Sequence, residues 1–316
     1  MKKILITGGA GFIGSHLIRR LLSARQYFIY CLDNFDEFYS RKQKEYNLRD
    51  LVRNPSFRLI EGDIRNVDSF SHLPEIETII HLAAKTGVRP SISDPSLYYE
   101  VNVGGTQNLL EFARHRNIRQ FIFASSSSVY GINQNVPWNE NEKLLPISPY
   151  AASKLSCEML GHVYHSLYGL QFIALRFFTV FGPSQRPDLA IHKYIRRISE
   201  GRDIPMFGDG STERDYTYVD DIVDGIVSAI DYTASGFEII NLGNHRSVKL
   251  KDLIGTIEDV IGKKALIEQL PQQPGDVPAT YADISKAKKL LGYHPHTDLK
   301  TGIENFYEWY NAFYAT

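Results

Sequence analysis

The sequence of 316 residues predicts an α/β fold with a doubly wound parallel sheet and a smaller C-terminal lobe. Three observations support this prediction. Short apolar runs alternate with stretches whose apolar residues recur at helical spacing. A glycine-rich turn separates the first apolar run from the first helical stretch. After about Phe181, proline and glycine become frequent and the character of the chain changes.

The expected strands and helices follow one another along the chain. Apolar runs that predict buried parallel strands lie at residues 3–7, 27–32, 57–60, 78–82, 121–124, 172–177 and 237–242. Helical patterns lie at residues 11–24, 103–115, 151–168 and 219–230. Because strands alternate with helices, we expect helices on both faces of the sheet. We expect residues 1–180 to form the sheet domain, joined again by about 216–243, and residues 181–316 to form most of an interleaved second lobe.

The bulk composition argues against several classes of protein. The formal net charge is -1, so we expect neither a nucleic-acid surface nor a membrane-binding face. No apolar stretch reaches the length of a bilayer and the chain has no leader-like start, which predicts a cytoplasmic protein. Cys31 lies in an apolar run and Cys157 in a helical pattern, so we expect no disulfide and no metal site.

Residues 7–14 (TGGAGFIG) place glycines between the first strand and the first helix. In such a turn Gly8 permits the tight bend, Gly11 lets the backbone approach a pyrophosphate, and Gly14 lets the helix pack close to the strand. The helix N-terminus then faces the phosphates. This pattern predicts a Rossmann-type dinucleotide site. A purely structural glycine turn is the alternative, and the flanking strand and helix favour the dinucleotide site.

An acidic residue at the end of the second strand bears on the choice of dinucleotide. Asp33 follows the glycine turn by about 20 residues, where a carboxylate accepts hydrogen bonds from the adenosine ribose hydroxyls. The same carboxylate would repel a 2′-phosphate, so we expect NAD rather than NADP. His81 is expected to be a hydrogen-bonded core residue. The further residues expected at the cofactor are Phe12, Ile13, Asn34, Asp63, Ile64, Leu82, Ala83, Ala84 and Lys85.

Residues 149–154 (PYAASK) open a helical pattern and place Tyr150 and Lys154 four positions apart, on one helix face. A phenol with a pKa of about 10 is a weak base at neutral pH. An adjacent ammonium and a positively charged nicotinamide both favour the phenolate, so we expect Tyr150 to exchange protons with a substrate. The spacing alone is common on helix surfaces, but here it follows a dinucleotide turn in the same chain.

Four consecutive serines, residues 125–128, follow an apolar strand at the edge where α/β sheets bind ligands. Their hydroxyls could hydrogen-bond the reacting oxygen beside Tyr150. Serines also cap helices and form turns, which is the structural alternative. We expect at least one of the four to be catalytic.

These residues together resemble the extended short-chain dehydrogenase/reductase family, in particular its nucleotide-sugar epimerases. The resemblance covers essentially the whole chain and includes residues 214–221 (RDYTYVDD). It implies that the tyrosine deprotonates the sugar 4-hydroxyl while hydride passes from C4 to NAD. The 4-keto sugar then rotates and takes the hydride back on its other face, so NAD is regenerated in each turnover.

The serine segment distinguishes members of this family. Related 4,6-dehydratases carry Asp-Glu before the Val-Tyr-Gly of the segment, and related UDP-glucuronate decarboxylases carry Glu directly before the Val. This chain has Ser127 and Ser128 there, so the resemblance disfavours both activities. In the same register Ser126 matches the family's catalytic Ser/Thr, with Ser127 and Ser128 as helpers that also contact the substrate.

Residues 176–188 (RFFTVFGPSQRPD) bear on the substrate. UDP-glucose 4-epimerases usually have Asn where this chain has Thr179, whereas Thr followed by Arg-Pro-Asp is similar to UDP-glucuronate 4-epimerases. A C5 carboxylate needs a positioned guanidinium and a hydroxyl, which Arg186 and Thr179 could supply. Residues 273–277 (QPGDV) also resemble that group, whereas Ser184-Gln185 departs from its usual Trp-Gly. We therefore expect interconversion of UDP-glucuronate and UDP-galacturonate.

Three more residues are expected at the UDP-sugar. The resemblance implies that Arg214 grips the diphosphate, because two phosphates favour a guanidinium fork. Arg89 is a second basic candidate near the sugar, and Asp276 is a candidate contact to the ribose or uracil. A plain surface charge is an equal alternative for Arg89 and Arg186, and an ordinary ion pair is the alternative for Arg214.

Two other functions stay open on the sequence alone. A UDP-glucose or UDP-N-acetylglucosamine 4-epimerase would share the catalytic residues and differ in its substrate contacts. A catalytically silent NAD-binding regulatory module is a different class, and it would have no reason to keep Ser126, Tyr150 and Lys154 together. The helical patterns at residues 103–115 and 151–168 resemble the pair that forms a four-helix dimer interface in the family, which implies a homodimer.

Overall fold

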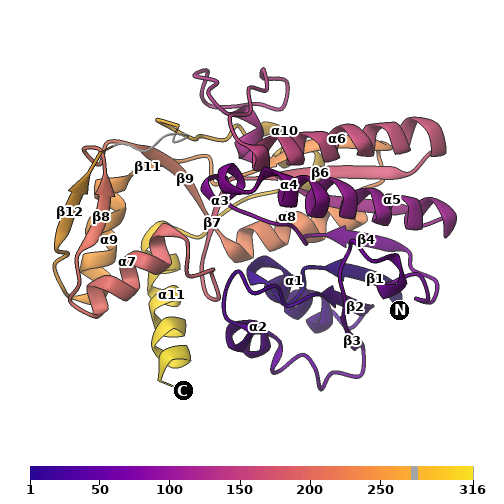
Figure 1. Ribbon diagram of the computed structural model, residues 1–316, viewed down its shortest axis with the longest axis horizontal. Helices are drawn as coiled ribbons and strands as arrows, with labels where there is room; N and C mark the ends of the chain where they lie inside the picture. Colours follow the sequence, from indigo (N-terminus) through magenta and orange to yellow (C-terminus); the bar gives the residue numbers. More distant parts are fainter. Residues whose placement is uncertain (272–276, 316) are drawn as a thin grey trace.

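The computed structural model describes residues 1–271 and 277–315 and confirms the predicted α/β architecture (Figure 1). Seven strands form one sheet in the order β10-β6-β5-β4-β1-β2-β3, and every neighbouring pair is parallel. These strands are β1 (Lys2–Thr7), β2 (Tyr27–Asp33), β3 (Phe57–Glu61), β4 (Thr78–His81), β5 (Gln120–Ser126), β6 (Gln171–Phe177) and β10 (Phe237–Leu242).

Helices cover both faces of this sheet, because successive side chains of a strand point to opposite sides. Ile4 and Ile6 of β1 belong to one hydrophobic cluster, and Leu5 between them belongs to the other. Helices α1 and α8 pack on the first cluster, and α5 and α6 pack on the second (Figure 1). The bounds of these helices are α1 (Phe12–Ser23), α5 (Gly105–His115), α6 (Pro149–Tyr168) and α8 (Val219–Asp231).

The remaining elements lie beside the large sheet or connect its strands. A three-stranded sheet has the order β11-β9-β7, and a two-stranded sheet joins β12 to β8. The strands are β7 (Thr179–Phe181), β8 (Ile204–Phe207), β9 (Glu213–Tyr218), β11 (Ser247–Lys249) and β12 (Ile267–Leu270). The helices are α2 (Arg41–Leu48), α3 (Val88–Ser93), α4 (Pro95–Tyr98), α7 (Ala190–Ser199), α9 (Leu250–Ile261), α10 (Ser285–Leu291) and α11 (Leu299–Tyr314).

The ends of several elements differ from those expected, by a few residues at each end. Strand β5 continues through Ser126, beyond its apolar run, because it pairs residue for residue with β6. The helix expected at 103 begins at Gly105, after a π-helical turn at Tyr99–Gly104. Helix α6 begins two residues early because the Ser148 hydroxyl caps it, accepting a hydrogen bond from the Ala151 amide at 3.1 Å.

The chain leaves the large sheet after β6 and returns to it through α8 and β10. Strand β10 pairs with β6 from Phe237 to Leu242, so the edge of the large sheet is built from a late part of the chain. Within the described residues, no helix combines the length and apolar character needed to cross a bilayer. The division of the chain into a cofactor domain and a substrate lobe stays a prediction.

A close contact in the middle of α6 gives a test of this packing. Gly161 lies against Phe172 of β6, and a Cβ placed there would come within 2.2 Å of the ring. Phe172 is fully buried and stacked between Phe121 and Phe237, so it cannot move aside. We expect Gly161→Ala to lower the free energy of unfolding by about 1–3 kcal/mol, measured by urea denaturation. Gly255→Ala in α9 is the matched control, because nothing lies within 4 Å of its Cβ position.

The control should raise stability by about 0.5–1 kcal/mol through helix propensity alone. Equal effects of the two substitutions would contradict the close approach of α6 to the sheet.

Candidate active site

A cavity of about 490 Å³ lies at the carboxyl ends of the parallel strands. Residues at the ends of β1, β2, β4, β5 and β6 line it, as expected for an α/β sheet. The cavity brings together every residue expected at the cofactor, from the glycine turn to Lys154. Of the residues expected at the substrate it contains Ser126, Ser127, Ser128, Thr179 and Arg186.

The glycine turn is packed so closely that side chains are excluded. Gly8 has a φ of 72°, and a Cβ there would lie 2.7 Å from the Ala83 amide nitrogen. A Cβ on Gly14 would lie 2.4 Å from the Gly8 carbonyl oxygen. The turn therefore presents bare backbone to the cavity just before α1 begins, which is the cradle that a pyrophosphate requires.

Asp33 holds the glycine turn to the end of β2. Its carboxylate accepts hydrogen bonds from the Ala10 amide at 3.0 Å and from the Phe35 amide at 2.9 Å. Burial raises the pKa of Asp33, and these two amides together with Lys44 act in the opposite direction. A carboxylate has about four acceptor positions, so two amide contacts leave capacity for a ribose hydroxyl.

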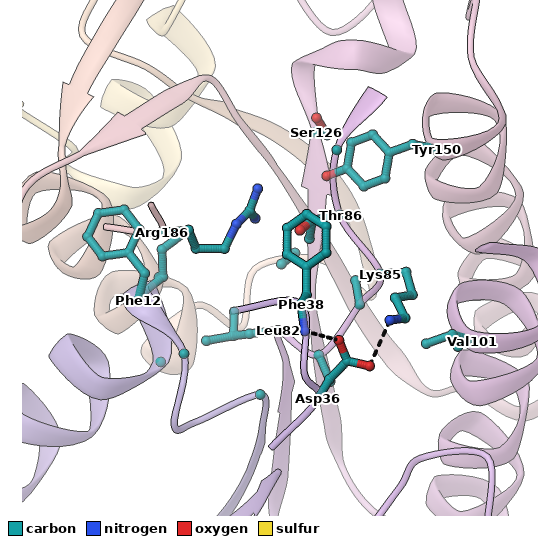
Figure 2. A pocket seen from close by; sticks show the side chains of 18 of the residues that line it. Phe12, Asp36, Phe38, Leu82, Lys85, Thr86, Val101, Ser126, Tyr150 and Arg186 are labelled. Carbon is teal, nitrogen blue, oxygen red and sulfur yellow. Dashed lines mark hydrogen bonds and ion pairs between the residues drawn. The ribbon is translucent and has the colours of Figure 1, made fainter. Parts of the chain in front are cut away.

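The neighbouring strand ends complete this side of the cavity. Asp63 accepts hydrogen bonds from Arg65 and Asn34, and the Arg65 contact lowers the pKa of Asp63 to about 2. Lys85 forms an ion pair with Asp36 at 2.7 Å, and Figure 2 shows this pair among the residues that line the pocket. An ionised Asp63 and a paired Lys85 give this end of the cavity fixed polar groups.

His81 is a core residue, as expected. Its ring nitrogens lie 2.7 Å from the Thr7 hydroxyl and 3.0 Å from the Thr106 hydroxyl. The side chain is 1% exposed, and burial lowers the pKa of His81 to about 3. A neutral histidine with both nitrogens satisfied ties β4 to β1 and α5, and it takes no part in the chemistry of the cavity.

Tyr150, Ser126 and Lys154 meet at the end of β5. Figure 2 shows the Ser126 hydroxyl and the Tyr150 phenol facing each other, and the Ser126 hydroxyl donates to the Ser128 hydroxyl at 3.0 Å. Burial raises the pKa of Tyr150, whereas the Ser126 contact and the positive charge of Arg186 lower it. The Lys154 ammonium donates to the Ala124 carbonyl at 2.7 Å and lies 6.0 Å from the centre of the Tyr150 ring. The sequence pointed to Lys154 as the cation that lowers the pKa of the phenol, whereas the cation that acts on Tyr150 in the structure is Arg186.

Arg186 and Thr179 line the cavity together with residues 125–128, which we call the serine turn. Figure 2 shows the Arg186 guanidinium extending into the pocket toward Ser126 and Tyr150. Two hydrogen bonds of 2.9 Å each join it to the carboxylate of Asp188. Arg186 therefore already has the bidentate geometry in which a guanidinium binds a carboxylate. A substrate carboxylate would compete with Asp188 for it.

Two residues expected at the substrate lie outside the cavity lining, and a third is not among the described residues. Arg89 does not line the cavity; its guanidinium carbon lies 4.9 Å from the centre of the Phe207 ring, where α3 meets β8. Arg214, on β9, also lies outside the lining and donates to the Glu213 carbonyl at 2.8 Å. Asp276 is outside the described residues.

Four lining residues that follow Asn34 were not expected from the sequence. Asp36, Phe38 and Tyr39 line the cavity, and Lys44 of α2 joins them by donating to the Asp36 carbonyl at 2.6 Å. This segment has neither a strand period nor a helical one, so no pattern places it. The one available signal is its position directly after a strand end of the sheet.

Comparison with known proteins agrees with this geometry. A family model described as GDP-mannose 4,6 dehydratase matches residues 5–306. A UDP-glucuronate 4-epimerase from Thermodesulfobacterium geofontis is 39% identical over 310 residues, which cover 96% of this chain and 95% of that protein.

Two solved structures extend the comparison. The crystal structure of the UDP-glucuronic acid 4-epimerase from Bacillus cereus in complex with UDP-glucuronic acid and NAD is 40% identical, with a TM-score of 0.94, over 98% of this chain and 99% of that one. The structure of the UDP-glucose 4-epimerase from Thermotoga maritima with UDP-glucose is 32% identical, with a TM-score of 0.90, over 98% and 99%. The chain belongs to the GDP-mannose 4,6 dehydratase family of extended short-chain dehydrogenases/reductases.

Proposed function

We propose that this protein interconverts UDP-glucuronate and UDP-galacturonate by NAD-dependent epimerisation at C4. The observation that carries the proposal is one cavity lined by Tyr150, Ser126 and Lys154 on one side and by Arg186 and Thr179 on another. The relatives from T. geofontis and B. cereus, both UDP-glucuronate 4-epimerases, support it.

The glycine turn, Asp33 and Lys154 are the residues that would hold NAD. When bound, NAD supplies a hydride acceptor for the sugar C4 and returns the hydride later in the same turnover. The backbone of Gly8 and Gly11 suits the pyrophosphate, and Asp33 suits the adenosine ribose. An ammonium has three donors, and the Ala124 carbonyl takes one, so Lys154 has donors for a second ribose.

Tyr150 is the group that moves the proton. Its phenolate takes the proton from the sugar 4-hydroxyl, and the resulting phenol returns it to the same oxygen when the other epimer forms. Ser126 and the charge of Arg186 both lower the pKa of the phenol and so favour the phenolate against the effect of burial. The serine hydroxyl also offers a donor to the sugar oxygen on which negative charge develops.

The serine turn supplies no acid for a second reaction. Ser127 and Ser128 line the cavity, where related dehydratases and decarboxylases carry carboxylates. Elimination of water from a 4-keto sugar needs one group that removes a proton from the carbon next to the ketone. It needs a second group that protonates the leaving hydroxyl. Hydroxyls with ordinary acidity serve this poorly, so re-reduction is the favoured fate of the 4-keto sugar.

A carboxylated substrate adds a hazard that Arg186 can control. Oxidation at C4 places a ketone next to the carbon that bears the carboxylate, and such a β-keto acid loses carbon dioxide readily. A bidentate contact from Arg186, aided by the Thr179 hydroxyl, would hold the carboxylate away from the alignment needed for bond breaking. Arg186 thus serves both to select the substrate and to protect it.

One observation favours a second candidate, a neutral UDP-hexose 4-epimerase. Arg186 already has a carboxylate partner in Asp188, so a neutral sugar could occupy the cavity without breaking that pair. The relative from T. maritima, a UDP-glucose 4-epimerase, shows that the fold serves such a substrate. Comparing turnover of UDP-glucuronate, UDP-glucose and UDP-N-acetylglucosamine by product chromatography, without added reductant, separates the two.

We assign the UDP part of the substrate to the C-terminal lobe, in keeping with the expected division at about residue 181. Arg89 and Arg214 lie outside the cavity lining, so we assign Arg214 to the diphosphate, as the family resemblance implies, and neither residue to the sugar carboxylate. Arg89 of the expected sheet domain contacts Phe207 of β8, which belongs to the expected C-terminal lobe. A substrate bound beside this contact would therefore touch both the sheet domain and the lobe.

An exposed apolar stripe on α6 supports the proposed homodimer. Met159, Val163 and Leu167 recur every four residues and are 48%, 44% and 66% exposed. Side chains four apart share one helix face, and α5 lies alongside α6. A second copy of the same pair would bury this stripe. The cytoplasmic location stays a prediction.

Tyr150→Phe tests the proton transfer. Removing the phenol oxygen should lower kcat by about 10²–10⁴-fold, because general acid–base catalysis contributes that much. NAD content and the unfolding midpoint should stay unchanged. Product chromatography from UDP-glucuronate measures the rate. A variant that keeps full activity would exclude Tyr150 as the base.

Arg186→Met tests the substrate assignment. Loss of a charge-assisted contact should reduce kcat/KM for UDP-glucuronate by about 10–100-fold, and have a much smaller effect for UDP-glucose. Arg202→Met is the control, since Arg202 forms an exposed ion pair with Glu200 outside the cavity. Unchanged turnover of UDP-glucuronate would refute the proposed role of the carboxylate.

Val163→Glu tests the dimer. A charge buried without a partner opposes association, so the variant should run as a monomer in size-exclusion chromatography with light scattering while the parent runs as a dimer. Val52→Glu is the matched control, because Val52 is 51% exposed on another part of the surface. A dimeric Val163→Glu protein would place the interface elsewhere.

A further inference from the structure

Among the ion pairs in residues 1–271 and 277–315, the most deeply buried joins Glu158 of α6 to Arg176 of β6. The side chains are 0% and 1% exposed, and the guanidinium donates to both carboxylate oxygens, at 2.9 and 2.8 Å. Removing two charges from water is costly, and apolar residues often give equal or greater stability in the same space. Stability alone therefore does not account for the pair.

The pair anchors both ends of the serine turn. The Ser125 hydroxyl donates to Glu158 at 2.5 Å, and Arg176 donates to the Tyr130 hydroxyl at 2.9 Å. Between these two anchors lie residues 126–128, which face the cavity. Ser125 and Arg176 are also register partners in the β5–β6 ladder, so the anchor is set by strand pairing.

The same helix face carries the catalytic residues. Tyr150, Lys154 and Glu158 are spaced by four residues on α6, and each contacts the end of β5. Tyr150 meets Ser126, Lys154 donates to the Ala124 carbonyl, and Glu158 accepts from Ser125. Three successive turns of α6 thus face three successive residues of β5, Ala124, Ser125 and Ser126.

We propose that Glu158 and Arg176 are a positioning pair that holds the serine turn and the Lys154 ammonium in register with Tyr150, a role that rests on the epimerase activity proposed above. Neither side chain lines the cavity, so the pair acts through the groups that do. Bidentate geometry restricts rotation of both partners, and this keeps the helix and the strand in one alignment.

The pKa of Lys154 gives a specific test of this positioning role, because it depends on the charges around the ammonium. Lys154 is faced by Tyr150, Cys157 and Glu158 on its own helix, by the neutral His81 on β4 and, through Glu158, by Arg176 on β6. Burial lowers the pKa of Lys154 to about 8, and the charge of Glu158 acts upward. Loss of the Glu158 charge should therefore lower the pKa of Lys154 further.

Glu158→Gln is the first test, since it keeps the shape of the side chain and removes its charge. We expect kcat for UDP-glucuronate to fall by about 10–100-fold with KM little changed, because misplacement of reacting groups costs about that much. The alkaline limb of kcat against pH should move to lower pH. A folded variant with the parent kcat and pH profile would overturn the proposal.

Two further variants decide the matter if Glu158→Gln folds poorly. Ser125→Ala leaves the ion pair intact and removes one anchor of the serine turn, so kcat should fall by up to about tenfold. The double variant Glu158→Gln with Arg176→Met removes both charges and should regain stability without regaining kcat. Recovery of kcat together with stability, or parent activity in Ser125→Ala, would overturn the proposal.

Ile118→Ala is the control for a general loss of stability. Ile118 is buried in the connection between α5 and the start of β5, whereas the cavity lies at the other end of that strand. It should lower the unfolding midpoint and leave kcat and its pH profile unchanged; the same pH shift in this variant would overturn the proposal. A parent enzyme that turns over no UDP-sugar would overturn the proposed function, whereas an active parent with an unaffected Glu158→Gln variant would overturn only the positioning role.

Discussion

The packing of α6 against the ends of β5 and β6 positions Tyr150, Lys154 and Ser126, the three groups that we propose to transfer or stabilise the proton. One helix face presents Tyr150 and Lys154, and the end of β5 presents Ser126 to meet them. Gly161 lets the helix approach the sheet closely, because a side chain there would collide with Phe172. The distance between the helix and the sheet therefore sets the distance between the reacting groups.

The electrostatics of the cavity balance burial against a few placed charges. Burial raises the pKa of Tyr150 and lowers that of Lys154, so each change works against the charged form that catalysis uses. Arg186 and Ser126 offset the effect on the phenol, and Glu158 offsets the effect on the ammonium. The same low-polarity surroundings strengthen the hydrogen bonds that act on a developing charge.

Local motifs were predictable because their chemistry depends on neighbours in the sequence. The glycine turn needs residues 8, 11 and 14 in one tight bend, and the tight contacts at Gly8 and Gly14 confirm that side chains are excluded there. The four-residue spacing of Tyr150 and Lys154 already places them on one helix face. The order of strands and helices was predictable for the same reason, since hydrophobic periodicity is a local property.

The sequence alone determined the fold class, the dinucleotide turn and the tyrosine–lysine pair, because each is encoded within one segment. Tertiary structure decided which distant side chains meet. It brought Arg186 and Asp36 into the lining of the same cavity as Tyr150, and it left Arg89 and Arg214 outside that lining. It also created the pair of Glu158 and Arg176, which lie on different elements and meet because α6 packs against β6. Contacts of this kind depend on packing and strand register, and no local pattern in the sequence records them.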